Sequence, residues 1–210
     1  MRGFFHFFKA HRVGKFAINL IDSFMSHFTD TYEIVRQITP EGVDFFFMSF
    51  GEREIIKVVR YSYIMDFQGM YLYNLGFGDY NYRARLYSDD IVANNGDPYG
   101  LYHTVLATIP CFFQIYEDAM LMVQGSDSTL RFQKDCRIIC TRKCPLDTCK
   151  KAHRRISIYR NYIDKYFERL TQEYEFFGSL TTFENQLLIE DYIKGKKYLT
   201  ILLKKRKFII

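Results

Sequence analysis

Hydrophobic and polar residues alternate along several short segments in the first half of the chain, and this period of two predicts β-strands. The segments are rich in β-branched and aromatic residues, and turn residues such as Pro40 and Gly42 separate them. Strands joined by such short turns form an antiparallel meander. The predicted strands are residues 32–38, 43–50, 54–64 and 70–77.

The second half mixes helical and extended patterns. Apolar residues recur at helical spacing from Leu101 to Phe113, with Pro110 expected to kink or shorten that helix. A second stripe runs from Tyr159 to Leu170, with charged residues on the opposite side. Strands are predicted at residues 119–124, 174–180 and 198–203. The pattern indicates an α+β fold, with a mainly antiparallel twisted sheet and two principal helices.

Length and composition fit one α+β domain over residues 25–210. The chain has 210 residues, 48% of them hydrophobic, which is enough for a substantial core. Residues 1–24 are aromatic and basic without strand alternation, and Met25 follows them. We expect a dispensable or mis-annotated extension there, with translation starting at Met1 or Met25; the alternative is a helix lying on a membrane surface.

Targeting signals bear on the compartment. Charged and histidine residues interrupt the first 20 residues, so they do not form the apolar core of a secretory signal. No stretch approaches 18 uncharged apolar residues, which argues against a transmembrane helix. We therefore expect a cytoplasmic protein, in which thiols stay reduced.

Four of the five cysteines fall within fourteen residues, inside a segment at 130–152. Thiolates bind metals, and four of them supply a tetrahedral zinc site. If the segment were one continuous helix, three of the sulfurs would form a ridge too long for a single ion, so a break is required; Pro145 offers one. The predicted ligands are Cys136, Cys140, Cys144 and Cys149, with His153 as an alternative ligand.

Two further interpretations of the cysteines stay open. They could form two disulfides that staple an exposed insertion, or they could be small thiols lining a helix face. Cys149 and His153 are also spaced to meet on one helix face, as a nucleophile and its base would, although such pairs are common by chance. Zinc is thus an expectation that depends on how the segment folds.

Positive charge is concentrated around the same segment. Between Arg131 and Arg160 the sequence has ten lysines and arginines and only two acidic residues, Asp135 and Asp147. This window therefore carries a net charge of +8, whereas the whole chain carries +5. Such a surface can bind nucleic-acid phosphates with a strong salt dependence. The alternative is a solvated, charge-rich insertion that binds nothing.

Six short motifs in order resemble an uncharacterised bacterial family, a domain of unknown function. The resemblance runs from about Tyr32 to Arg206, and the segment from Leu130 to Ala152 looks like an insertion relative to shorter members. The resemblance therefore implies no role for the cysteines. The motifs are NLGFGDY (74–80), NNGD (94–97), VLAT (105–108), GSDS (125–128), RISIY (155–159) and YEFFG (174–178).

The order of elements is also similar to that of acetyl-CoA-dependent N-acetyltransferases, in which a loop before the first helix cradles phosphates. The glycine pattern of that family is not met by the NNGDPYG loop, and Asp97 would repel a phosphate there. Asp97 instead suits the N-cap of a helix. The resemblance implies an acetyltransferase-like topology, while the loop argues against acetyl transfer.

These patterns favour a binding or interaction module that contacts a small ligand or a protein partner. A group transferase, which could serve as the toxin of a toxin and antitoxin pair, and a nucleic-acid binder are the alternatives. The two polar loops would face one cleft if the topology is acetyltransferase-like. The candidate ligand-binding residues are Asn94, Asn95, Gly96, Asp97, Gly125, Ser126, Asp127, Arg155 and Tyr159.

Overall fold

The computed structural model describes residues 31–88, 95–140, 144 and 149–207, without the side chain of Ile139. The chain separates into two compact units. One holds the described residues up to Ile64 together with Leu75–Glu117, and the other holds Met65–Asn74 with the described residues from Asp118 onward. Residues 1–24 and Met25 lie outside the described residues, and the prediction of one domain over 25–210 stays a prediction.

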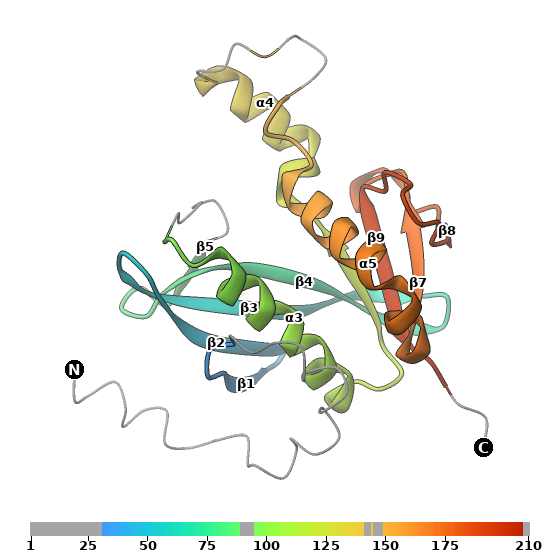
Figure 1. Cartoon of the computed structure of the whole chain (residues 1–210), viewed down its shortest axis with the longest axis horizontal. Coiled ribbons are helices and arrows are strands. Elements are labelled where there is room, and N and C mark those ends of the chain that lie inside the picture. The colour runs from blue at the N-terminus through green and yellow to red at the C-terminus, as the bar shows by residue number, and fades with distance from the viewer. Residues whose placement is uncertain (1–30, 89–94, 141–143, 145–148, 208–210) are drawn as a thin grey trace. The chain divides into compact units, whose positions relative to one another are not determined.

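The first unit begins with the predicted meander (Figure 1). Strand β2 pairs antiparallel with β1 and β3, and the short β5 pairs antiparallel with β4. Side chains on β2 are buried almost throughout, because this strand lies between two neighbours. The strands are β1 (Val35–Thr39), β2 (Gly42–Phe50), β3 (Glu54–Phe67), β4 (Met70–Asn81) and β5 (Leu86–Ser88); the end of β3 and the start of β4, within Met65–Asn74, belong to the second unit.

Helix α3 (Pro98–Ile115) supplies the other half of the first core, with eight buried residues. Phe112 is completely buried and stacks on Tyr61 of β3 at 4.5 Å between ring centroids. The Tyr61 hydroxyl forms a 2.7 Å hydrogen bond with Thr108, so its polar end is satisfied inside the core. The helix continues through Pro110 to Ile115, contrary to the expected shortening, because the residues after the proline pack into this core.

The second unit carries the remaining strands. Strand β6 (Met120–Gln124) pairs parallel with the start of β4, and β9 (Thr200–Lys205) lies between β6 and β7 (Tyr174–Ser179), antiparallel to both. The short β8 (Glu190–Asp191) pairs with β7. The first four residues of β6 are buried, as the apolar run predicts for a central strand.

Two helices of the second unit flank the cysteine segment. Helix α4 (Leu130–Ile139) follows the 3-10 turn η3 (Ser126–Ser128), and α5 (Arg154–Glu173) begins after the cysteines; a second 3-10 turn, η4 (Phe183–Asn185), follows β7. The buried residues Ile156, Ile163 and Leu170 lie on one face of α5, as the predicted stripe requires, and α5 contacts β6 and β7.

The predicted fold class is confirmed. The described strands are mostly antiparallel, with the β4 and β6 pair as the parallel exception, and helices pack on them in both units, which is an α+β arrangement. No described helix combines the length and the apolar character that a membrane crossing would require.

Candidate functional site

The described part of residues 130–153 consists of α4, Cys140, Cys144 and residues 149–153, which lead into α5; we call this segment the cysteine hairpin. Thr129 caps α4, because its hydroxyl accepts a 3.1 Å hydrogen bond from the Phe132 N–H. Cys136 is the buried member among the described side chains of α4, whereas Ile138 is 84% exposed. This helix therefore lies largely in solvent, and Figure 1 shows it extending beyond the N-terminal end of α5.

The base of the cysteine hairpin is fixed by Asp127. Its carboxylate oxygen Oδ2 accepts hydrogen bonds from the backbone N–H groups of Arg154 and Arg155, at 2.8 and 3.0 Å. These are two of the otherwise unpaired donors at the N-terminus of α5, so a residue 27 positions earlier supplies the helix cap. Arg155 also donates to the Ser126 hydroxyl at 2.5 Å. The predicted site residues Ser126, Asp127 and Arg155 are thus brought together, and their hydrogen bonds join η3 to α5.

Gly125 and His153 also contribute to the connection between η3 and α5. A Cβ atom on Gly125 would lie 2.5 Å from Asp127 Oδ1 and 3.1 Å from the Ile156 nitrogen, so the close approach of loop and helix requires a glycine. His153 takes a left-handed conformation (φ 61°) directly before α5, and its N–H donates to the Asp127 carbonyl. Its predicted role as a metal ligand stays a prediction.

The four clustered thiols lie in two close pairs. The Sγ atoms of Cys136 and Cys149 are 3.6 Å apart, and those of Cys140 and Cys144 are 3.7 Å apart. The Cys136 thiol also interacts with Cys140, which links the two pairs. None of the cysteines is joined in a disulfide. Helix α4 ends at Ile139, so the break that a shared metal requires comes before Pro145, and the chain folds back on itself.

A backbone donor points at one of these sulfurs. The Lys150 N–H donates to Cys144 Sγ at 3.4 Å, whereas the Ala152 N–H donates to the carbonyl oxygen of Cys149 at 3.0 Å. Burial, followed by contact with Cys149 and Cys140, raises the pKa of Cys136 to about 11. Burial also opposes ionisation of Cys149, but nearby backbone N–H groups and Cys136 outweigh this and lower the pKa of Cys149. The pairs are therefore polarised, with Cys149 the more acidic thiol.

Within the described part of the chain, no three or more histidine, cysteine, aspartate or glutamate side chains surround a single point at metal-binding geometry. The predicted cysteine ligands are clustered, and their assembly around one ion would require the two pairs to close further.

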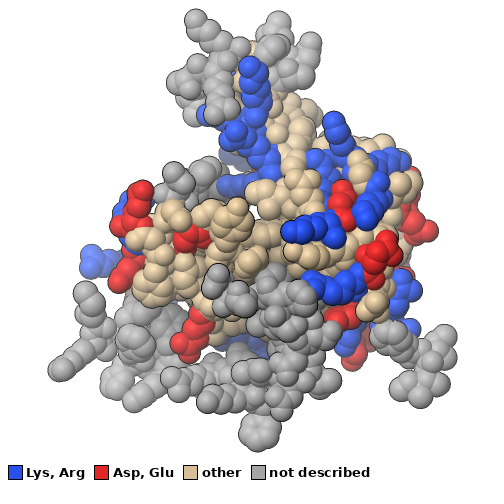
Figure 2. Space-filling model, in the orientation of Figure 1, with Lys and Arg blue, Asp and Glu red and all other residues tan. Residues whose placement is uncertain are grey.

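The positive charge predicted for this region lies on the opposite face of α4 from the thiols. Arg131, Lys134 and Arg137 recur every three residues and are exposed, so they share one face. Arg131 forms a 3.7 Å ion pair with Asp135. Figure 2 shows lysine and arginine side chains running along α4 toward α5. In the described residues no carboxylate lies within ion-pair distance of Lys134, Arg137, Lys150 or Arg154.

The second predicted loop belongs to the first unit. Asn94 lies outside the described residues. Asn95 is 97% buried; its amide donates to the Ser49 hydroxyl and the Arg53 carbonyl, and its oxygen accepts from the Arg53 N–H. Gly96 takes a left-handed conformation (φ 77°), which turns the chain into α3. The polar atoms of Asn95 are thus used to hold β2, the β2–β3 turn and the loop together.

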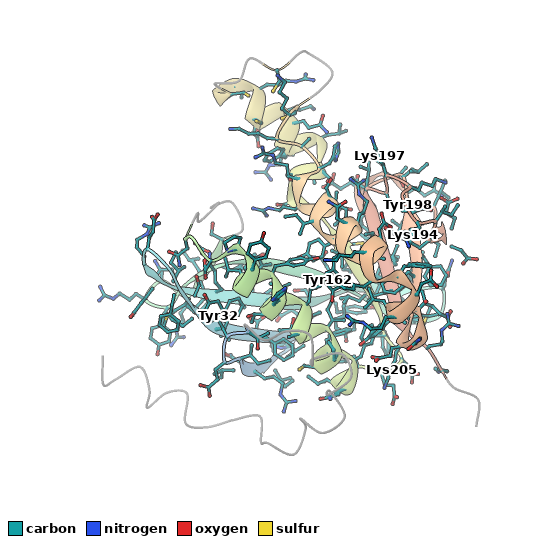
Figure 3. All side chains as sticks on the ribbon, viewed as in Figure 1. Tyr32, Tyr162, Lys194, Lys197, Tyr198 and Lys205 are labelled. Carbon is teal, nitrogen blue, oxygen red and sulfur yellow. The ribbon has the colours of Figure 1, made fainter. Side chains whose placement is uncertain are left out.

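Asp97 occupies the N-cap position of α3, as predicted, but its side chain does not cap the helix. Its Oδ2 atom accepts instead from the hydroxyls of Tyr32, at 2.5 Å, and Ser49, at 2.7 Å. Burial, and then the bond to Asp97, raises the pKa of Tyr32 (labelled in Figure 3). The side chains of Asn95 and Asp97 in this loop, Ser49 on β2 and Tyr32 before β1 therefore form one network that joins β2, the start of α3 and the segment before β1.

The remaining candidate, Tyr159, lies on α5. Burial raises its pKa to about 12, against an opposing effect of Arg155, so the phenol stays neutral at physiological pH. The two predicted loops fall in different units, so their convergence on one cleft stays a prediction.

Residues that no sequence motif singles out also connect distant parts of the chain. Arg160 donates to the Tyr198 carbonyl and the Ser157 hydroxyl, and so ties α5 to the end of the chain. Tyr32 and Ser49 complete the Asp97 network. No local motif marks these residues, since the Tyr198 partner of Arg160 lies 38 positions away and the Asp97 partner of Tyr32 lies 65 positions away. Their contacts follow from the assembled fold.

Comparison with known proteins gives one match. The model of a family of unknown function, DUF6934, matches residues 29–133. The match includes the Asn95 and Asp97 network and the GSDS turn, and it ends three residues before Cys136. No curated protein and no solved structure matches the chain.

Proposed function

Because the chain belongs to the family of unknown function DUF6934, whose description names no activity, we propose a function from the geometry of the molecule. The protein is a cytoplasmic binding module, and the basic face of its cysteine hairpin binds the phosphate backbone of a double-stranded nucleic acid. The observation that carries this proposal is the set of exposed cations on the hairpin, together with Arg154 at the start of α5, that have no carboxylate partner among the described residues.

The polar loops fit this proposal better than they fit a small-molecule site. The carboxylates of Asp97 and Asp127 and the amide of Asn95 are engaged in hydrogen bonds that hold strands, helices and turns together. A ligand binding to them would have to replace these bonds, which costs free energy. In contrast, Lys134, Arg137 and Arg154 are exposed, so phosphate oxygens can reach them without such a loss.

The chemistry of the hairpin favours a duplex over a single strand. Sites for single strands combine cations with aromatic rings on which bases stack. On α4 the aromatic residue is Phe132, which is half-buried beside the thiol face, whereas the basic face consists of Arg131, Lys134 and Arg137. A helix that offers cations without stacking rings suits the evenly spaced phosphates of a duplex.

The test is a fluorescence-polarisation titration of the whole chain with a short labelled duplex of arbitrary sequence. If four phosphates are neutralised, the affinity falls by about a hundredfold between roughly 50 and 200 mM salt. In the triple variant Lys134→Gln, Arg137→Gln and Arg154→Gln, one of the four phosphate contacts remains. The loss of affinity over the same salt range then shrinks to about fourfold.

A matched control separates position from net charge. Lys194 and Lys197, in the turn beside Tyr198 (Figure 3), and Arg53 are exposed cations outside the hairpin. Their triple substitution by glutamine removes the same charge and leaves the salt dependence unchanged. Equal losses in the two triple variants, tighter binding to a single strand, or no binding at the lower salt concentration would each contradict the proposal.

A further inference from the structure

Helix α4 lacks the apolar contacts that ordinarily hold a helix of its length in place. It has ten residues, whereas isolated helices shorter than about 12–15 residues are marginal in water. On its inward face lie Phe132, Gln133 and Cys136, and of these only Cys136 is buried. Something other than an aliphatic core must hold the cysteine hairpin, and the four thiols are placed where such a core would be.

The sulfur distances suit a shared metal ion and are too long for disulfides. In a tetrahedral site with Zn–S bonds of about 2.3 Å, neighbouring sulfurs are about 3.8 Å apart. The measured distances are 3.6 Å for Cys136 and Cys149, and 3.7 Å for Cys140 and Cys144. A disulfide would bring the sulfur atoms to about 2.05 Å. Each pair therefore already has nearly the length of a tetrahedron edge, and the Cys136 interaction with Cys140 lies between the pairs.

The surroundings of the sulfurs suit thiolates bound to a cation. The backbone N–H of Lys150 donates to Cys144 Sγ, and a donor of this kind orients a metal-bound ligand and stabilises its negative charge. Four thiolates around one Zn²⁺ carry a net charge of about −2, which the lysines and arginines of the hairpin offset.

From this geometry we infer that Cys136, Cys140, Cys144 and Cys149 bind one structural zinc ion, which holds α4 against the returning chain. The site is closed, with four protein ligands and no open position for a substrate. Binding releases the thiol protons to solvent, and its free energy becomes folding energy of the hairpin. The inference concerns the inward face of the hairpin and does not depend on nucleic-acid binding by the outward face.

Cys111 provides an internal control. It lies on α3 in the first unit, and its thiol donates to the Ala107 carbonyl of its own helix at 3.5 Å. Burial raises the pKa of this thiol, which keeps it protonated. It should bind no metal, and the variant Cys111→Ser should keep the full zinc content.

The experiment is native mass spectrometry of the whole chain, purified under reducing conditions and supplied with zinc, before and after treatment with a chelator. We expect one zinc per chain, lost on chelation, one zinc in Cys111→Ser and none in Cys136→Ser. Cobalt added to the metal-free wild-type chain should give the visible absorption of a tetrahedral thiolate complex, a readout that does not depend on how the variants fold.

Two results would overturn the inference. One is a metal-free mass with all five thiols reacting in the folded chain, which means free cysteines. The other, for a parallel sample purified without a reductant, is a metal-free mass lower by the four hydrogens lost in two disulfides and restored by a reductant. Either result leaves the nucleic-acid titration to be judged separately, because that titration measures cations on the other face of α4.

Discussion

Helices α3 and α4 are held in place by opposite means. Helix α3 buries eight residues, among them Phe112 and Phe113, and it lies within the part of the chain that matches the family. Helix α4 buries Cys136 among its described side chains, and its cysteines lie beyond the matched residues. A helix with a large apolar face is fixed by the hydrophobic effect, whereas one without it depends on caps and cross-links.

The two regions also differ in the polar and charged groups that they leave exposed to solvent. The first unit is held by stacked rings and by the Asp97 network, in which the polar groups of Asp97, Ser49 and Tyr32 bond to one another. Among its described residues the cysteine hairpin instead exposes seven, including the charged Arg131, Lys134, Asp135, Arg137 and Lys150. Surfaces that stay in solvent are the ones that can bind, provided that a few fixed points keep them ordered.

The largest effect is expected from emptying the core under α3. Replacing Phe112 by alanine removes a completely buried ring stacked on Tyr61 and should lower the free energy of unfolding by about 3–5 kcal/mol, measured by chemical denaturation. Tyr99→Ala on the same helix, where the side chain is 78% exposed, should change it by less than about 0.5 kcal/mol. Equal effects of the two changes would mean that the buried core does not hold α3 in place, and the contrast with α4 would not stand.

Asp127 should have the next largest effect, because it joins the base of the hairpin to α5. Asp127→Ala removes the acceptor of the Arg154 and Arg155 N–H groups and should cost about 2 kcal/mol of stability in urea denaturation. Asp127→Asn keeps an acceptor oxygen and should lose less. If alanine and asparagine are equally harmless, the nonlocal cap does not stabilise the second unit.

Thr129 should have the smallest effect. Thr129→Ala removes the side-chain cap of α4 and should cost the helix about 1 kcal/mol. The measurement is amide hydrogen exchange of α4 itself, because a partly exposed helix can open without unfolding the rest of the chain. Thr129→Ser keeps the hydroxyl and should retain wild-type protection, while unchanged protection in Thr129→Ala would mean that the cap is unimportant.

The sequence predicts the regular elements well, because their signals are local. Alternation marks the meander, and the apolar stripe marks α5, although the helix begins at Arg154, five residues before the stripe. The expected shortening of α3 at Pro110 does not occur, because burial of Phe112 and Phe113 outweighs the loss of one backbone hydrogen bond. Local patterns thus identify elements more reliably than they locate their ends.

The candidate residues were harder to interpret, since polar residues in turns serve ligands and structure alike. Asp97 has the sequence context of a cap but bonds to Tyr32 and Ser49, whereas Asp127 caps a helix that begins 27 residues later. Such partners depend on the tertiary fold, which spacing along the chain does not reveal. The chemistry of the cysteines is easier to predict, because four thiols in one short segment restrict it even before their distances are known.

The most direct test of the central claim, that a metal and not an apolar core orders α4, is hydrogen exchange of the zinc-loaded chain with and without a chelator. Amides of residues 130–139 should lose protection when zinc is removed, while those of α3 keep theirs. If α4 stays as protected after chelation as before, the cysteine hairpin is ordered without zinc and the account is contradicted.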